Sequence, residues 1–331
     1  MSSLEMIVLA TALLIGGDGS ITPSETEIRK VIERSIPYIE AQGVSWMETK
    51  NCVSCHRTGM MTWSLAAAKR KGFRVSDQLD EWFTWSLESS LETNDQGKLV
   101  GAGNKEGLVQ LMMTRTLVEN TDTRRDSFAR FASIIANDQE PDGSWKPGGQ
   151  LPSQKRSKDE TTIVTTMWLA LALADSDPGP EAHEVLSRAL KQVQSGEPGT
   201  STEWYAVRLL LAHQLHDEQT AAEMVEKLRR QQRDDGGWGW LADERSDALG
   251  TGLALYALLQ ARIDDERIIV PAVRFLVENQ QEDGSWPVPG TKEKKRNGIE
   301  ETATYWGATW AVLALTKSLP AGPNPNSVAA E

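Results

Sequence analysis

Three copies of a short motif, Gln-x-x-x-Gly-x-Trp, recur in this 331-residue chain, at positions 139–145, 232–238 and 280–286. Each copy has Asp directly before its Gly and follows an amphipathic run with helical spacing of its apolar residues. Pro271 suits the first turn of the run that ends at Gln280. The Asp-Gly step is expected to end each helix and turn the chain. Internal repeats of this kind predict a tandem array of helical units.

A longer and more apolar helix is predicted after each of these loops, rich in Ala and Leu on most faces and therefore buried. Extending the alternation of polar and apolar helices along the chain gives six helix pairs and needs no strand. Tandem helical hairpins form an open solenoid or close into a ring of inner and outer helices, and six pairs favour closure. The predicted pairs are 25–42 with 56–71, 76–93 with 105–119, 122–139 with 159–175, 179–195 with 200–216, 217–232 with 244–262, and 267–281 with 300–319.

The copy at 272–286, Ala-x-x-Phe-Leu-x-x-x-Gln-x-x-x-Gly-x-Trp, resembles the QW repeat of squalene-hopene and oxidosqualene cyclases. The resemblance covers most of residues 25–319. It implies an all-α fold, the terpenoid cyclase-like (α/α)6 toroid that protein prenyltransferases share, as one domain over residues 21–319. It also implies that Trp145, Trp238 and Trp286 have a structural role, stacking on the Gln of the repeat and tying neighbouring helices together.

Cyclases of this family start their reaction with an acidic Asp-x-Asp-Asp motif at the beginning of an inner helix. This sequence has no such motif, and its nearest acidic segments offer Asp247, Glu300 and Glu301 as candidate acids. The same residues fit the beginning of a helix, where carboxylates satisfy free amides and the helix dipole. The resemblance thus makes a terpenoid cyclase-like or isoprenoid-binding protein one functional hypothesis. The zinc site of prenyltransferases, built from Asp, Cys and His, has no counterpart here.

The only two cysteines of the chain lie in the run Cys-Val-Ser-Cys-His at 52–56, which reads as a c-type haem attachment sequence. Thiols three positions apart can add to the two vinyl groups of one haem, and the adjacent imidazole then binds the iron. The sequence therefore predicts covalent haem c, tethered by Cys52 and Cys55 with His56 as the proximal ligand. The same spacing fits a dithiol redox pair or a zinc site completed by two of three histidines. Those histidines are His183, His213 and His216.

The haem motif stands at the start of the first predicted inner helix, which places the haem at the mouth of the toroid cavity. A distal ligand would come from a methionine or histidine on a predicted inner helix. An open sixth position would favour catalysis or small-ligand binding over electron transfer. The candidate distal ligands are Met60, Met61, Met112, Met113, Met167 and His213.

Eight aromatic residues fall on predicted inner helices, where they either line an apolar cavity or pack between helices. Aromatic rings that cover a haem would lower its exposure to solvent and raise its potential. These residues are Trp63, Trp168, Trp204, Tyr205, Tyr256, Tyr305, Trp306 and Trp310.

Residues 1–20 contain an apolar stretch at 6–16 that is too short to span a bilayer and fits a secretory signal peptide. Glu5 and the lack of a preceding Lys or Arg depart from that pattern, and a helix fragment is the alternative. Export to the periplasm agrees with c-type haem, which is attached outside the cytoplasm. The net charge of −12 argues against nucleic acid or an anionic membrane surface as partner. The Pro-rich segment 320–331 predicts a disordered tail.

Together these features favour an exported c-type haem protein on a squalene-cyclase-like toroid. It would act in electron transfer or redox chemistry with a redox partner protein or a small apolar ligand, and it would have no transmembrane span. A terpenoid cyclase-like or isoprenoid-binding protein is the alternative. A scaffold that binds a protein partner, with a purely structural haem, is a third hypothesis.

Overall fold

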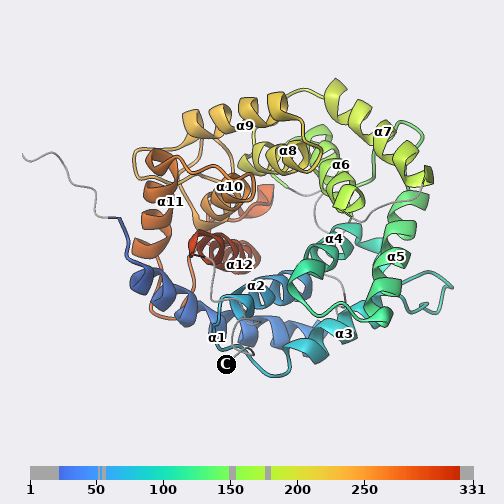
Figure 1. The fold of residues 1–331 in the computed structure, drawn as a ribbon, viewed down its shortest axis with the longest axis horizontal. Helices are drawn as coiled ribbons and strands as arrows, with labels where there is room; N and C mark the ends of the chain where they lie inside the picture. The colour runs from blue at the N-terminus through green and yellow to red at the C-terminus, as the bar shows by residue number, and fades with distance from the viewer. Residues whose placement is uncertain (1–21, 51–52, 54–56, 149–153, 176–179, 321–331) are drawn as a thin grey trace, which may run out of the picture.

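The structure is a computed structural model that describes residues 22–50, 53, 57–148, 154–175 and 180–320. Over these ranges the chain forms twelve α-helices, joined by loops that contain short 3-10 helices and isolated β-bridges. Successive helices alternate between an outer and an inner ring (Figure 1). The outer helices are α1 (Glu25–Lys50), α3 (Leu79–Ser90), α5 (Asp122–Asn137), α7 (Pro180–Ser195), α9 (Glu218–Gln231) and α11 (Glu266–Glu278). The inner helices are α2 (Thr58–Arg70), α4 (Lys105–Met113), α6 (Lys158–Asp175), α8 (Thr202–Gln214), α10 (Ala248–Gln260) and α12 (Glu301–Ser318).

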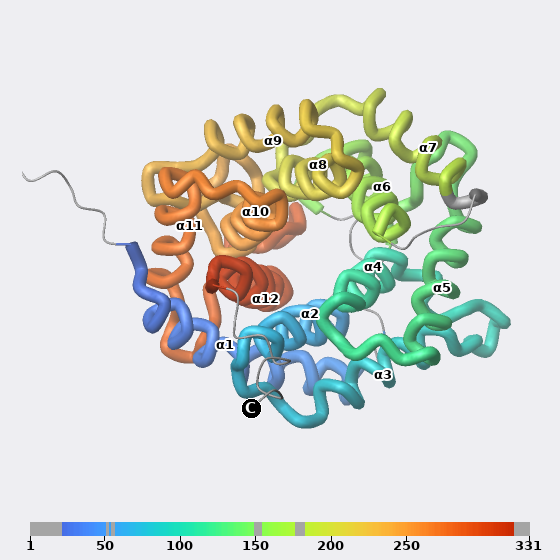
Figure 2. The backbone as a smooth tube through the Cα atoms, viewed as in Figure 1, coloured from blue at the N-terminus to red at the C-terminus, as the bar shows by residue number. Residues whose placement is uncertain are grey.

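The inner helices form a closed ring. Each packs on the inner helix before and after it, and α12 packs on α2 to complete the circle (Figure 2). The outer ring closes where α1 packs on α11. The predicted all-α (α/α)6 toroid is therefore confirmed, and the helices of all six predicted pairs are present.

Burial separates the two kinds of helix. All residues from Ala248 to Leu258 on inner helix α10 are buried, whereas outer helix α9 buries only Met224 and Leu228. An inner helix is surrounded by neighbours on every side, so it must be apolar all round, while an outer helix needs only one apolar stripe. None of the described helices combines the length and apolarity needed to cross a membrane.

The three repeated tryptophans are buried and anchor each loop to the helix that precedes it. In every copy the indole Nε1 donates a hydrogen bond of 2.8 Å to the carbonyl ten residues earlier. Each tryptophan thus has a structural role, as predicted, but its bond holds the loop to its own helix. The predicted tie between neighbouring helices is made by the glutamine instead. The three bonds run from Trp145 to Ile135, from Trp238 to Leu228 and from Trp286 to Leu276.

The glutamine of each copy connects its own outer helix to another outer helix. Its Nε2 donates to the loop carbonyl of its own Gly and to a backbone carbonyl of the other helix. The last copy joins α11 to α1 and so ties the end of the ring to its beginning. These bonds between helices, 2.8–2.9 Å long, run from Gln139 to Val185, from Gln232 to Ile268 and from Gln280 to Val31.

The glycine of each copy lies against the same outer helix, three residues beyond the carbonyl that the glutamine binds. Gly143, Gly236 and Gly284 all have positive φ, between 85° and 89°. A Cβ on Gly284 would overlap the carbonyl oxygen of Arg34 on α1. Only glycine therefore satisfies both the turn and the close approach.

One local expectation was wrong. Pro271 lies inside α11 and not in its first turn, because the helix already begins at Glu266. The carboxylate of Asp265 caps the helix there by accepting a hydrogen bond from the backbone N–H of Arg267 at 3.1 Å. The carbonyl of Pro271 is the atom that Gly236 of the second repeat approaches.

We expect Gly284→Ala to lower the free energy of unfolding by about 2–4 kcal/mol, because it combines a strained φ with a backbone clash. Gly72 is the matched control: its φ is +82°, but no atom lies within 4 Å of the position that a Cβ would take there. Gly72→Ala should cost only about 1–2 kcal/mol. Urea denaturation measures both values, and equal losses would contradict the proposed helix contact.

Candidate functional site

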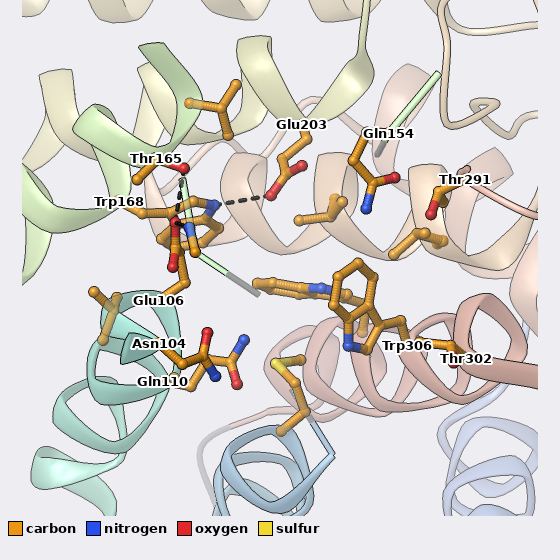
Figure 3. Close-up of a pocket in the computed structure, with 18 of the residues that line it drawn as sticks. Asn104, Glu106, Gln110, Gln154, Thr165, Trp168, Glu203, Thr291, Thr302 and Trp306 are labelled. Atoms are coloured by element: carbon orange, nitrogen blue, oxygen red, sulfur yellow. Dashed lines mark hydrogen bonds between the residues drawn. The ribbon is translucent and has the colours of Figure 1, made fainter. Parts of the chain in front are cut away.

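A cavity of about 300 Å³ lies at the N-terminal ends of the inner helices. Side chains from the first turns of α2, α4, α8, α10 and α12 reach it, together with loop residues that precede α6 and α12. Six indole rings contribute to its apolar wall, namely Trp46, Trp63, Trp168, Trp240, Trp306 and Trp310. Its polar lining includes Asn104, Glu106, Gln110, Gln154, Thr165, Glu203, Thr291 and Thr302 (Figure 3).

Glu106, the second residue of α4, presents a carboxyl group to this cavity (Figure 3). Its Oε1 accepts a hydrogen bond of 2.8 Å from the Thr165 hydroxyl and a longer one of 3.4 Å from the Gly148 N–H. Burial raises the pKa of Glu106, and this effect outweighs the hydrogen bonds that act in the opposite direction. Burial thus shifts the ionisation of Glu106 toward the neutral, proton-carrying form.

Three oxygen atoms on the polar side of the cavity are buried and have no hydrogen-bond partner among the described residues. They are Oε2 of Glu106 and the amide oxygens of Gln110 and Gln154. Leaving such atoms unpaired costs about 1–3 kcal/mol each. The cavity is therefore suited to a ligand that is mostly apolar and carries a small polar group such as a hydroxyl.

Glu203, the second residue of α8, is held in a different environment. Its Oε1 accepts from the indole Nε1 of Trp168 at 2.9 Å, and its Oε2 pairs with the buried guanidinium of Arg156 at 2.8 Å. Arg156 also lies over the ring of Trp240, 5.2 Å from the ring centroid. The cavity thus has one carboxyl group whose pKa is raised by burial and one that is paired with a cation.

The three acids predicted from the sequence lie at helix starts, and none lines this cavity. Asp247 caps α10, accepting from the Gly250 N–H at 2.8 Å, and also accepts from the Trp240 N–H at 2.9 Å. Burial raises the pKa of Asp247 to about 6. Glu300 caps α12, and Glu301 is exposed and pairs with Arg57 at 2.8 Å.

The predicted haem-binding residues Cys52, Cys55 and His56 lie outside the described residues. The flanking Arg57 is 1% exposed, with its guanidinium 4.5 Å from the Trp46 ring centroid and 5.0 Å from that of Tyr305. Met60, in the first turn of α2, lines the cavity. The start of α2 thus contributes to the cavity wall.

The candidate distal methionines and histidine are spread over the toroid. Met60 alone among the six lines the cavity at the N-terminal ends. Met61 is buried beside Gly43 of α1, and Met112 and Met167 belong to the core. Met113 and His213 line a second cavity at the opposite end of the ring. No cluster of three or more His, Cys, Asp or Glu residues suited to a metal ion occurs in the described part of the chain.

Four of the predicted aromatic residues form a plug across the middle of the ring. The Trp63 ring centroid lies 5.3 Å from that of Trp310 and 5.6 Å from that of Tyr256, and Trp168 lies 6.0 Å from Trp310. Trp63 borders the cavities on both sides. Of the other four, Trp306 lines the first cavity, whereas Trp204, Tyr205 and Tyr305 line neither cavity.

Sequence reasoning did not single out Glu106 or Glu203 as site residues. Both are acidic residues in the first turn of a helix, a position where carboxylates are common for reasons of helix stability alone. The available signal was that both lie in the first turn of an apolar inner helix. Which of these acids face the cavity depends on how each inner helix is rotated within the ring, and the sequence does not show this.

Comparison with known proteins supports the fold. Residues 207–324 match the family model of the squalene-hopene cyclase C-terminal domain. A comparison with curated protein sequences gives no significant match. The type II terpene cyclase MstE from Scytonema, solved with geranylgeranyl dihydroxybenzoate, is 13% identical, with a TM-score of 0.56 over 88% of this chain and 97% of that chain.

Two carbohydrate-active enzymes have the same fold. A glycosyl hydrolase family 88 protein from Bacteroides vulgatus is 13% identical, with a TM-score of 0.57 over 89% of this chain and 99% of that chain. The unsaturated glucuronyl hydrolase from Bacillus sp. GL1 is 14% identical, with a TM-score of 0.52 over 78% and 83% of the two chains. The chain is thus a terpenoid cyclase-like (α/α)6 toroid, and at these identities the likeness establishes the fold alone.

The raised pKa of Asp247 predicts a pH-dependent stability. The folded protein holds the Asp247 proton up to about pH 6, whereas the unfolded chain releases it near its ordinary value of 3.8. The contribution of Asp247 to the free energy of unfolding should therefore fall by up to about 3 kcal/mol as the pH rises between these values. Urea denaturation of the wild type and Asp247→Asn at several pH values measures this, and a difference that stays constant with pH would contradict it.

Proposed function

We propose that this protein binds a small isoprenoid-like ligand, mostly apolar with one hydroxyl-type group, in the cavity at the N-terminal ends of its inner helices. The observation that carries the proposal is the buried, unpartnered Oε2 of Glu106 facing a cavity with indole walls. Isoprenoid chains suit such walls because they bury apolar surface against rings. A terpene cyclase with this fold was solved with a geranylgeranyl-bearing compound, which agrees with this ligand class.

Protonated Glu106 can donate its O–H to the polar group of the ligand. The same geometry is suited to proton transfer onto a ligand double bond, with the carboxylate left behind accepting from Thr165 and the Gly148 N–H. A carbocation formed in this way would lie among indole faces, which attract positive charge. Glu203 lines the same cavity and is paired with Arg156 at 2.8 Å.

Farnesol, an uncharged isoprenoid alcohol, is the probe that tests this site. We expect it to bind saturably near pH 5 and several-fold more weakly near pH 9, because an ionised Glu106 would keep water in the cavity. Glu106→Gln stays neutral and should bind with little dependence on pH. Tryptophan fluorescence titration reports the binding, and an unchanged pH dependence in Glu106→Gln would contradict the role given to this residue.

A second pair of variants locates the ligand. Thr302 lies at the start of α12 and lines the cavity, so Thr302→Trp should fill the space and weaken farnesol binding by roughly tenfold or more. Thr123 is an exposed residue on outer helix α5, and Thr123→Trp is the control for the added ring. Equal binding by the two variants would place the ligand elsewhere.

We further propose that Cys52 and Cys55 attach haem c and that His56 binds its iron. The pentapeptide itself supports this, together with the buried Arg57 that directly follows it and with Met60, which lines the cavity. An apolar thioether, an indole and a buried guanidinium suit an apolar macrocycle that carries carboxylates. When bound, haem supplies an iron that accepts or donates one electron. Export to the periplasm and a redox partner protein belong to this proposal.

Expression in a periplasm with haem-attachment machinery tests the second proposal. We expect an optical spectrum of haem that survives a denaturing wash and is lost in Cys52→Ala/Cys55→Ala. His183→Ala, on outer helix α7, is the control and should keep the haem. Wild-type protein without covalent haem would overturn this proposal and leave the farnesol experiment unaffected.

A further inference from the structure

A second and larger cavity, of about 980 Å³, opens at the C-terminal ends of the inner helices. The aromatic plug separates it from the first cavity, and Trp63 and Tyr256 of the plug form part of its wall. Leu171, Leu210 and Leu313 add apolar surface. The volume falls within the range of about 300–1,000 Å³ that is typical of small-molecule sites.

The rim of this second cavity is basic, although the whole chain has a net charge of −12. Lys69 and Arg70 lie in the last turn of α2, Lys71 follows them, and Lys317 lies in the last turn of the neighbouring α12. Cations at helix ends offset the helix dipole, but α4, α6 and α10 have none in their last turns. Dipole compensation therefore does not account for four cations gathered on two adjacent helices.

None of these four cations pairs with a carboxylate among the described residues. Asp175, the carboxylate in the lining, is bound by Arg115 at 2.9 Å. Burial lowers the pKa of Lys71 and of Lys317, and neighbouring cations lower both further. An anion at this rim would relieve that repulsion.

Thr316 supplies an independent observation. It is 3% exposed and lines the second cavity, yet its Oγ1 has no hydrogen-bond partner in the part of the chain that the structure describes. A buried hydroxyl of this kind is normally satisfied. Thr316 lies between Leu313 of the apolar wall and Lys317 of the basic rim on the same helix. Its hydroxyl could therefore bond to the head group of a ligand.

We infer that this second cavity binds an amphiphile with a phosphate or carboxylate head group and a single alkyl chain. The head group would lie beside Lys69, Lys317 and Thr316, and the chain would lie against Trp63 and Tyr256. The inference is independent of the proposed function, because it concerns the opposite mouth of the ring.

Isothermal titration calorimetry with decyl phosphate, below the concentration at which it forms micelles, tests the inference. We expect one saturable site, with inorganic phosphate and decanol each binding at least about tenfold more weakly. If inorganic phosphate bound as tightly as decyl phosphate, the alkyl chain would contribute nothing to binding. The cavity would then be an anion site, and the inference that it binds an amphiphile would be overturned. Decanol binding as tightly would overturn the role of the basic rim.

Two sets of variants locate the ligand at this mouth. Lys69→Gln/Lys317→Gln should weaken decyl phosphate binding roughly fivefold to tenfold, while Lys191→Gln/Lys227→Gln on outer helices α7 and α9 should not. Thr316→Val should weaken binding about threefold or more without lowering the melting temperature, since it removes an unpaired hydroxyl. Equal losses in both lysine pairs, or unchanged binding in Thr316→Val, would overturn the assignment. Thr302→Trp should leave decyl phosphate binding unchanged.

Discussion

The toroid depends on a hydrogen bond that each repeat makes from a glutamine amide to the backbone of another outer helix. In all three copies the glycine contacts that helix three residues further on. The amide and the glycine together therefore fix the distance between the two outer helices and their register along each other. The indole bond of the same copy holds the loop to its own helix. Because the copy at 280–286 acts on α1, it converts a row of helical hairpins into a closed ring.

Closure of the ring determines where function can lie. All inner helices run in the same direction, so their first turns meet at one mouth and their last turns at the other. The cavity at the first mouth is lined by carboxyl groups, amides and indole rings, among other residues. The rim of the cavity at the second mouth carries lysines and an arginine. The aromatic plug lies between the two cavities, and one ring of helices thereby presents two chemically different cavities.

The helices could be predicted from the sequence because the spacing of apolar residues along a helix reflects which of its faces are buried. An inner helix such as α10 is apolar all round, and an outer helix such as α9 shows one stripe, so both were recognisable. The cavity was less accessible to sequence reasoning. Trp46 lies beyond the predicted end of the first helix at residue 42, and Gln154 and Thr291 reach the site from loops that are held together by a backbone bond from Lys155 to Thr291. Glu106 and Asp247 are both acidic residues near helix starts, and only the packing shows that one faces the cavity while the other caps a helix.

The central claim is that the mouth formed by the first turns of the inner helices is a ligand site for an isoprenoid-like molecule. A crystal structure of the protein grown with a bromine-labelled isoprenoid alcohol tests this most directly, because the anomalous signal of bromine marks the ligand without interpretation of weak density. We expect a bromine peak among Trp168, Trp306 and Glu106, inside the cavity. A peak confined to the outer surface of the ring, with this cavity filled only by water, would contradict it.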